Sequence, residues 1–454
     1  MGKKFDFDYI IIGSGPAGTT AALTLAKNKK KKVAIVEGNK YGGTNLNTRD
    51  VPYAISLDFV HNFYNIKSSP ELTGQVLHYN FPTIAAHQEK IAHSLGANNK
   101  KIFEDAGVTC IDGYANFLDP NTIAVGDKKI TSDYFILATG AKLNTGGIVG
   151  LDSVNYYTPD TIIKIRRLPK FILVVGGGST GCEIAEYFAK LGTKVILMEA
   201  DSRILPKEDK ETSDSMRDYF ERKLGIMIME NCKVVEITND KGVKRVVFAV
   251  GKREKMVHID CVVLATGSEP YTNYGLENAD VKFNKSGILV DKFFQTSARN
   301  IFAIGDCISN NSSTERAEHE ASVLADNLLH KVKTPIVHSG FTRITATEPE
   351  VATVGKTEAT LMKNKTKYKK AVVYLKDISA SKIYREDYGF AKILTDHSGR
   401  IVGATIMAPH ASLIVPELAI AVRHHLTALE IASTPHIANS FSYAIKLAAK
   451  KLAK

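Results

Sequence analysis

Closely spaced cysteine pairs are missing from this sequence, so a redox-active C-x-x-C or C-x4-C motif is excluded. Long apolar runs are missing as well, since none approaches the roughly 18 residues that a membrane-spanning helix needs. Structural disulfides are not expected in a reducing compartment. We interpret each of the five cysteines as a buried, unreactive thiol: Cys110, Cys182, Cys232, Cys261 and Cys307.

Acidic residues are outnumbered by basic ones, 48 against 59, which gives a net charge of +11. Two lysine-rich segments, 29–32 and 446–454, are interpreted as solvated surface, with attraction to an acidic membrane surface as the alternative. No nucleic-acid-binding motif accompanies the charge, so no nucleic acid partner is expected. The first eight residues lack the features of a secretory signal, which predicts a cytoplasmic protein.

The N-terminal part of the chain carries a dinucleotide-binding fingerprint. An apolar strand at residues 9–12 leads into the sequence GSGPAG, then a helical segment and a second apolar strand that ends at Glu37. In this motif Gly13 makes a tight turn, Gly15 lets a pyrophosphate approach the backbone, and Gly18 allows close packing of helix on strand. The helix N-terminus stabilises the phosphate charge, and Glu37 accepts hydrogen bonds from ribose hydroxyls.

The same pattern occurs a second time. Residues 171–175 predict a strand, the sequence GGGSTG follows with Gly176, Gly178 and Gly181 in the three key positions, and the next strand ends at Glu199. Two dinucleotide sites in one chain predict two cofactors, and a tightly bound flavin, FAD, with an exchanging nicotinamide is the simplest pair. A chain of 454 residues is long enough for two to three domains.

The second acid decides which nicotinamide cofactor is expected. A carboxylate at Glu199 repels the 2′-phosphate of NADP(H), which favours NAD(H), although Arg203 lies close by in the sequence. With both cofactors bound, a hydride passes from the nicotinamide to the flavin, and the flavin passes electrons to an acceptor.

Further segments resemble one known family. Residues 133–140 and 260–267 are matching strand-then-turn segments, and residues 296–306 end in a Gly-Asp pair. Together with the Gly-Gly-Thr at 42–44 and the segment 350–358, they resemble the pyridine nucleotide–disulfide oxidoreductases over the whole chain. Dihydrolipoamide dehydrogenase, glutathione reductase and mercuric reductase belong to this family.

The resemblance implies an α/β fold with two Rossmann-like three-layer domains, for FAD and for NAD, and a C-terminal α+β dimerisation domain of helices on an antiparallel sheet. It implies a homodimer whose active sites are built from both subunits. The implied domains are FAD-binding for residues 1–149 and 270–337, NAD-binding for 150–269, and dimerisation for 338–454. The tail 440–454 has apolar residues at helical spacing, so this helix either covers the dimerisation domain or touches a membrane surface.

The resemblance also implies roles for single residues. Asp306 would bind the flavin ribityl chain, and Glu183 would lie beside the flavin where the nicotinamide arrives. Alternatively, Glu183 has only a structural role, in which its negative charge stabilises the start of its helix. The other residues implied to contact FAD are Pro16, Ala17, Gly43, Thr44, Ala115, Thr139, Gly140 and Ala317, and those implied to contact NAD are Gly178, Glu199 and Gly267.

The sequence departs from the family where the redox-active disulfide would stand. The family pattern after Gly-Gly-Thr is C-L-N-x-x-C-x-P-x-K, and Asn45, Asp50 and Ala54 replace its two cysteines and its lysine. Thiol–disulfide exchange needs a thiolate, so reduction of disulfide substrates is excluded. Asn45 is expected to donate a hydrogen bond to a quinone carbonyl, and Asp50 either relays a proton or caps a helix.

The C-terminal segment departs in the same direction. The family pattern is H-P-T-x-S-E, and this chain keeps the histidine as His436 but has Phe441 in place of the glutamate. An imidazole without a carboxylate to orient it is a poorer base. His436 is therefore interpreted either as a proton donor or as a structural histidine.

The expected function is that of an FAD-dependent NAD(P)H:acceptor oxidoreductase of the diaphorase or quinone-reductase type. A small-molecule electron acceptor would bind near Asn45, Asp50 and His436 of the partner subunit. The alternatives are an NADH oxidase, a metal-ion reductase, and a flavin-binding redox sensor or scaffold without turnover. No metal site is expected, since the adjacent His424 and His425 on a predicted helix point about 100° apart and chelate poorly.

Overall fold

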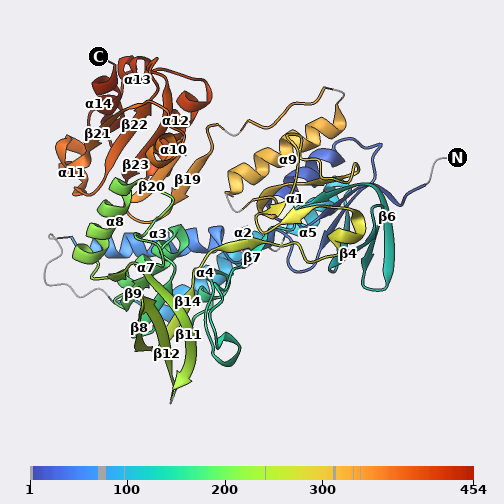
Figure 1. Ribbon diagram of the computed structural model, residues 1–454, viewed down its shortest axis with the longest axis horizontal. Coiled ribbons are helices and arrows are strands. Elements are labelled where there is room, and N and C mark those ends of the chain that lie inside the picture. The colour runs from blue at the N-terminus through green and yellow to red at the C-terminus, as the bar shows by residue number, and fades with distance from the viewer. Residues whose placement is uncertain are drawn as a thin grey trace.

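The computed structural model describes residues 4–69, 78–96, 98–240, 242–309, 313–330, 332–337 and 339–453. Three lobes are visible in Figure 1, and each is built on its own main sheet. The first lobe combines the N-terminal segment with residues near 270–330, the second holds the middle of the chain, and the third holds the C-terminal part. The α/β fold class is confirmed, whereas the residue boundaries between the domains stay predictions.

The first lobe contains a seven-stranded sheet in the order β3-β2-β1-β6-β5-β4, with β18 paired to β6. Its central strands read as unbroken apolar runs because both faces of the sheet are covered, one by helices and the other by strands β4 and β5 and the segment 274–288. Helices α1 (Pro16–Ala26) and α9 (Thr314–Leu329) lie side by side on one face. The strands are β1 Phe7–Ile12, β2 Val33–Glu37, β3 Thr109–Asp112, β4 Ala115–Asp119, β5 Thr122–Val125, β6 Lys128–Leu137 and β18 Ile301–Ala303.

The second lobe repeats this plan with a parallel sheet in the order β10-β9-β8-β14. A three-stranded antiparallel sheet, β11-β12-β13, packs beside it. Its helices are α6 Pro159–Ile162, α7 Ser179–Lys190 and α8 Lys210–Lys223. Its strands are β8 Phe171–Val175, β9 Lys194–Met198, β10 Met227–Met229, β11 Cys232–Asp240, β12 Val243–Val250, β13 Arg253–Ile259 and β14 Cys261–Leu264.

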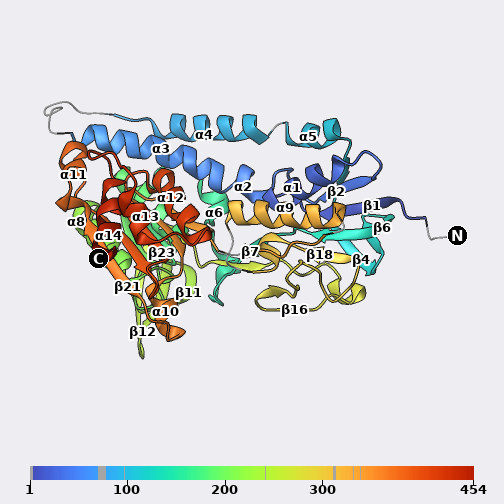
Figure 2. The same cartoon turned by 90° about the horizontal axis from the view of Figure 1, so that it is seen from above.

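Two connections join these lobes. The short antiparallel pair β7 (Ala141–Leu143) and β15 (Ser268–Pro270) carries the chain out to the second lobe and back. Along one side of the molecule run helices α3 and α4, and α3 also packs against α7 (Figure 2). The helices of this part are α2 Gly43–Asn47, α3 Asp50–Lys67, α4 Phe81–Gly96 and α5 Asn99–Ala106.

The C-terminal lobe is an antiparallel sheet, β19-β20-β23-β22-β21, covered by helices, as expected. The apolar face of α14 (Tyr443–Leu452) is buried in the core of this lobe, so the helix covers the sheet. Its strands are β19 Thr342–Thr345, β20 Glu350–Gly355, β21 Lys369–Tyr374, β22 Phe390–Thr395 and β23 Ile401–Ala408. The other helices are α10 Glu358–Lys363, α11 Ser379–Tyr384, α12 Ala411–Arg423 and α13 Ala428–Ser433.

Three local expectations were wrong. His424 and His425 do not share a helix, because α12 ends at Arg423 and His425 has a positive φ of 57°. The segment 296–306 was expected to be one strand, but it forms a strand only at β18 (Ile301–Ala303). Cys110 is partly exposed, whereas the other four cysteines are buried, and all five are free thiols. Within the described part of the chain, no helix is both long and apolar enough to cross a bilayer.

Candidate functional site

The first fingerprint loop has the geometry of a phosphate cradle. Gly13 has a φ of +100°, and a Cβ on Gly18 would lie 1.9 Å from the carbonyl oxygen of Gly13, so α1 packs too closely on the loop for any other residue. At Gly15 an added Cβ would meet nothing within 4 Å. The open space therefore lies at the N-terminus of α1, where backbone N–H groups and the helix dipole favour a phosphate group.

The second fingerprint has the same geometry at the N-terminus of α7. Gly176 has a φ of +106°, a Cβ on Gly181 would lie 1.8 Å from the Gly176 oxygen, and a Cβ on Gly178 would meet nothing within 4 Å. Gly178 itself has φ −70° and ψ −176°, which any residue adopts. Both loops thus fit the pyrophosphate of a dinucleotide, one at each sheet.

The two glutamates at the strand ends hold these loops. Glu37 accepts hydrogen bonds from the Ser14 N–H at 2.9 Å and from the Ser14 hydroxyl at 2.5 Å. Glu199 accepts from the N–H groups of Gly177 at 2.6 Å and Asp201 at 2.8 Å. Arg203 donates to the backbone oxygen of Glu208 at 3.0 Å within its own loop, so it is engaged away from a nucleotide phosphate.

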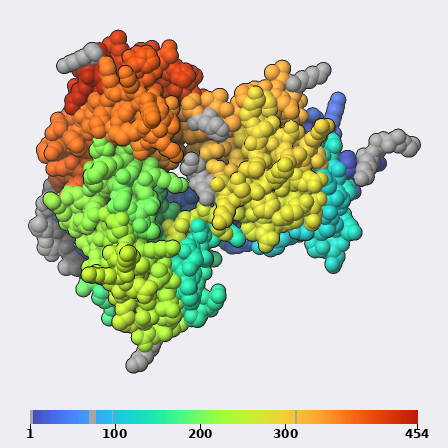
Figure 3. Space-filling model, in the orientation of Figure 1, coloured from blue at the N-terminus to red at the C-terminus, as the bar shows by residue number. Residues whose placement is uncertain are grey.

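One cavity of about 1110 Å³ connects the two fingerprints. Its volume exceeds the roughly 300–1,000 Å³ of a single-ligand pocket, and Figure 3 shows the surface hollowed where the three lobes meet. Gly18, Gly181, Ala115 and His436 lie outside its wall. The other expected site residues line it: Gly13, Gly15, Pro16, Ala17, Glu37, Gly43, Thr44, Asn45, Asp50, Thr139, Gly140, Gly176, Gly178, Glu183, Glu199, Gly267, Asp306 and Ala317.

A hydrogen-bonded triad lines the cavity at the start of α3 and α9. The Asn45 amide nitrogen donates to Asp50 Oδ2 at 2.5 Å and to Thr314 Oγ1 at 2.6 Å, and the Thr314 hydroxyl donates to Asp50 Oδ2 at 2.8 Å. Both amide hydrogens of Asn45 are therefore used inside the triad. The expected donation from Asn45 to a quinone carbonyl is not available in this arrangement.

Asp50 does not cap a helix through its side chain. Helix α3 begins at Asp50, the N-cap position is Arg49, and no side-chain cap hydrogen bond is formed there. The capping interpretation was wrong, because the Asp50 carboxylate accepts from Asn45 and Thr314 instead of from a backbone N–H. The carboxylate is still placed favourably near the positive end of the helix dipole.

Arg49 contributes a partly buried ion pair to the cavity wall. Its guanidinium donates to Asp160 in a bidentate manner, with Nε 2.8 Å from Oδ1 and the second nitrogen 2.9 Å from Oδ2. Asp160 also accepts from the Thr48 hydroxyl at 2.8 Å. This pair joins the loop before α3 to α6 in the second lobe, and it neutralises the cation nearest to Asp50.

Glu183 lies on α7 and faces the same cavity. Its carboxylate accepts a hydrogen bond from the Ala346 N–H at 2.8 Å. Burial raises the pKa of Glu183 to about 8, and the nearby carboxylates of Asp50 and Glu186 add to the increase despite the Ala346 hydrogen bond. Below about pH 8 the cavity therefore contains a neutral carboxylic acid at this position.

Sequence comparisons assign the chain to a family. Residues 7–321 match the profile described as pyridine nucleotide-disulphide oxidoreductase, and residues 341–449 match the profile of its dimerisation domain. The chain belongs to this family. Members use FAD and NAD(P)H, so the chain is an NAD(P)H-dependent flavoprotein oxidoreductase.

Relatives of this oxidoreductase span nearly its whole length. A mercuric reductase of Lysinibacillus sphaericus is 28% identical over 98% of this chain and 82% of its own. Dihydrolipoyl dehydrogenase 1 of Arabidopsis thaliana mitochondria is 28% identical over 97% of this chain and 89% of its own. The solved structure of the HOCl-induced flavoprotein disulfide reductase RclA from Escherichia coli has the same fold, with a TM-score of 0.87, 23% identity, and coverage of 98% of this chain and 99% of that one.

In this member of the family, His436 is oriented by an unexpected glutamate. Its Nε2 lies 2.9 Å from Glu417 Oε1 on α12, and its Nδ1 lies 2.9 Å from the backbone oxygen of Thr434. The expectation of an unoriented imidazole was wrong, because Glu417 supplies the carboxylate that Phe441 lacks. Both ring nitrogens face acceptors, which favours the structural role of His436 over proton donation.

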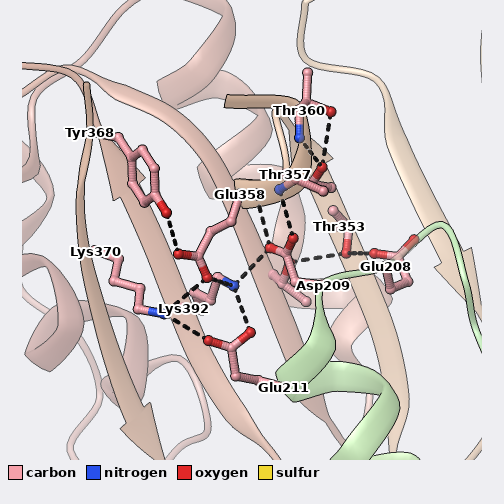
Figure 4. A network of polar contacts seen from close by, with 12 residues as sticks. Glu208, Asp209, Glu211, Thr353, Thr357, Glu358, Thr360, Tyr368, Lys370 and Lys392 are labelled. Carbon is pink, nitrogen blue, oxygen red and sulfur yellow. Dashed lines mark hydrogen bonds and ion pairs between the residues drawn. The ribbon is translucent and has the colours of Figure 1, made fainter. Parts of the chain in front are cut away.

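The dimerisation domain is tied to the second lobe by a buried charge network (Figure 4). Lys392 Nζ lies 2.7 Å from Asp209, 2.6 Å from Glu358 and 3.2 Å from Glu211. The Asp209 carboxylate also accepts from the backbone N–H groups of Glu358 and Ala359 at the start of α10. The Asp209 carboxylate, from the second lobe, thus caps α10 of the C-terminal lobe.

The neighbouring residue extends this network to the cavity. Glu208 accepts from the Thr353 hydroxyl at 2.6 Å and from Arg343 Nε at 3.2 Å. Glu208 and Arg343 both line the cavity near the second fingerprint. The wall of the nucleotide site is therefore held against the C-terminal sheet.

Several residues of this site were missed by sequence reasoning. Arg49 and Thr314 flank expected positions, and the basic residue next to Asp50 was a signal that could have been used. Glu417 and Arg343 carry no such signal, because their partners His436 and Glu208 are distant in the sequence and are brought near only by folding.

Replacing Gly178 by valine tests the second cradle. We expect NADH affinity to fall by roughly 10- to 100-fold, or about 1.4–3 kcal/mol, because the side chain fills space needed by a pyrophosphate. Bound FAD should stay, and dithionite should still reduce it. Gly15→Val is the matched change, expected to lower FAD content while leaving NADH affinity intact. Unchanged NADH binding in Gly178→Val would contradict this assignment, as measured by anaerobic titration.

Proposed function

We propose that this enzyme oxidises NADH and transfers the electrons from FAD directly to a small-molecule acceptor, without disulfide chemistry. The observation that carries the proposal is the hydrogen bond between Asn45 and Asp50, which occupy the two cysteine positions of the family pattern and line the cavity. Neither an amide nor a carboxylate forms a thiolate, which is the nucleophile in thiol–disulfide exchange.

The remaining cysteines support this proposal. Four of the five thiols lie outside the cavity wall, and Cys232, the fifth, lines it beside the second fingerprint. Thiolate ligands are the groups that bind soft metal ions, and no group of three or more His, Cys, Asp or Glu suited to a metal is found among the described residues. The metal-ion reduction for which the mercuric reductases are named is therefore not proposed for this chain.

The two cradles support a placement for each cofactor. FAD would lie along the first fingerprint with Asp306 at its ribityl chain, and NADH along the second, between Glu199 and Glu183. When bound, FAD accepts a hydride from the nicotinamide and passes on the electrons. The chain's own residues bind the phosphates at two helix N-termini, keep a proton on Glu183, and leave the face beside Asn45 and Asp50 for the acceptor.

A homodimer is part of the proposal. Apolar side chains on one side of the dimerisation domain are exposed, including Leu413 at 76% and Ile420 at 56% on α12 and Ile437 at 75%. Large exposed apolar side chains of this kind mark an interaction surface. A second copy covering them would place His436 of the partner subunit at the interface. A monomeric mass at micromolar concentration would contradict this.

An anaerobic NADH titration followed by addition of acceptors tests the function. We expect NADH to bleach the flavin absorbance without a thiolate–flavin charge-transfer band. Menadione or a redox dye should then restore the absorbance and sustain NADH oxidation well above the rate with oxygen alone. Lipoamide and glutathione disulfide should give no turnover. A bleached flavin that no acceptor reoxidises faster than oxygen would contradict the proposal.

A further inference from the structure

The surface beside Asn45 offers acceptor groups to a ligand. Both amide hydrogens of Asn45 and the hydroxyl hydrogen of Thr314 are donated inside the triad. The reverse amide orientation would place the Asn45 oxygen against the Asp50 carboxylate, so it is disfavoured. Asn45 Oδ1 and Asp50 Oδ1 remain, and no described residue donates a hydrogen bond to either. A ligand at this face therefore meets two oxygen acceptors, one of them charged.

Acidic side chains predominate in the wall of the cavity that the triad lines. Arg49, the nearest cation, is committed to Asp160 by its bidentate pair, and Ala54 leaves no charge where the family has lysine. Glu315, which follows Thr314 in the sequence, lines the cavity as well. Of the described residues, nine acidic and four basic ones line the whole cavity, and one of the nine acids, Glu183, keeps its proton below about pH 8; the chain as a whole carries a net charge of +11.

We propose that the acceptor reduced at this cavity is an organic cation, recognised by the oxygens of Asn45 and Asp50 that accept no hydrogen bond within the triad. The inference rests on the proposed function, because it names the substrate class of the same site. The positive net charge of the chain predicts the opposite preference, for an anion. Screening limits that long-range effect to about 8 Å at physiological salt, whereas a ligand beside Asp50 feels the carboxylate directly.

A neutral quinone and a metal cation fit this surface less well than an organic cation does. A neutral quinone presents carbonyl acceptors, and the triad has no hydrogen left to donate to them. A bare metal cation needs several ligands, and the described residues contain no group of three or more suited to one. An organic cation needs neither, since its charge is attracted directly by the Asp50 carboxylate.

Paired probes of opposite charge test the inference. The FAD-loaded enzyme is titrated by calorimetry with N-methylquinolinium and with naphthalene-2-sulfonate, two redox-inert aromatics of similar size. Turnover is measured in parallel with a cationic phenazinium dye and an anionic sulfonated quinone. We expect the cation to be preferred in both assays. Asp50→Asn should lower the cation-to-anion ratio roughly tenfold, as removal of one nearby charge implies.

The control variant is Asp105→Asn, which makes the same change in net charge at an exposed position of α5 outside the cavity. It should leave the ratio unchanged. A preference for the anionic probe, or a ratio that Asp50→Asn does not alter, overturns the inference. Absence of turnover with every acceptor overturns the proposed function instead, and the calorimetry still reports the charge preference.

Discussion

Replacing Lys392 by methionine is expected to lower the free energy of unfolding by about 3–5 kcal/mol. The side chain of Lys392 is 1% exposed and lies within 3.2 Å of three carboxylates, Asp209, Glu211 and Glu358. Methionine has a similar volume, so the cost comes from leaving buried carboxylates without their cation. Chemical denaturation followed by circular dichroism measures the change.

The pH dependence of the free energy of unfolding is a second test of the same network. Burial opposes ionisation of Glu211, but hydrogen bonds from Lys370 and Lys392 and the charge of Lys392 outweigh it and lower the pKa of Glu211 to about 2. A lowered carboxyl pKa stabilises the folded state above the ordinary value near 4.5, and this stability is lost as the pH falls towards 2. Lys392→Met should weaken this acid-side loss.

The matched control is Lys382→Met, which removes an ion pair with Asp387 at 3.0 Å whose side chains are 69% and 56% exposed. Solvent screens such a pair, so a change of less than about 1 kcal/mol is expected. Equal stability of Lys392→Met and the control would mean that the network does not hold the second lobe against the C-terminal sheet.

Replacing Glu183 by glutamine is expected to stabilise the enzyme at alkaline pH by up to about 5 kcal/mol relative to the wild type. In the folded state burial raises the pKa of Glu183 to about 8, against an ordinary value of 4.5. Between these two values the folded protein keeps a proton that the unfolded chain releases. Wild-type stability therefore falls as the pH rises through this window, at up to about 1.4 kcal/mol per unit.

Glutamine mimics the protonated carboxyl and binds no proton. The two proteins should be equally stable near pH 4.5, diverge up to about pH 8, and differ by a constant amount above it. Thermal unfolding of the FAD-loaded proteins from pH 4.5 to 9 measures this. Ala54→Lys, which introduces a cation into the cavity wall, should also flatten the wild-type dependence by favouring ionised Glu183. A difference in stability that stays constant from pH 4.5 to 9 would contradict the raised pKa of Glu183.

Much of the nucleotide-binding part of the site was predicted from local sequence. Gly13, Gly18, Gly176 and Gly181 have the backbone geometry or close packing that the fingerprints require. These positions could be predicted because a tight turn and a helix N-terminus are made by residues that are neighbours in the sequence. The arrangement of Asn45 against Thr314 was not accessible in this way, since 269 residues separate the two.

The sequence alone determined the family, the two nucleotide cradles, and the replacement of both cysteines by Asn45 and Asp50, because these are written in contiguous motifs. Only the tertiary structure decided which way the Asn45 amide points, that Glu417 orients His436, and that Arg49 is neutralised by Asp160. The physical reason is that hydrogen bonds and ion pairs depend on distances between groups brought together by folding. The chemistry that replaced the disulfide is therefore set by long-range contacts.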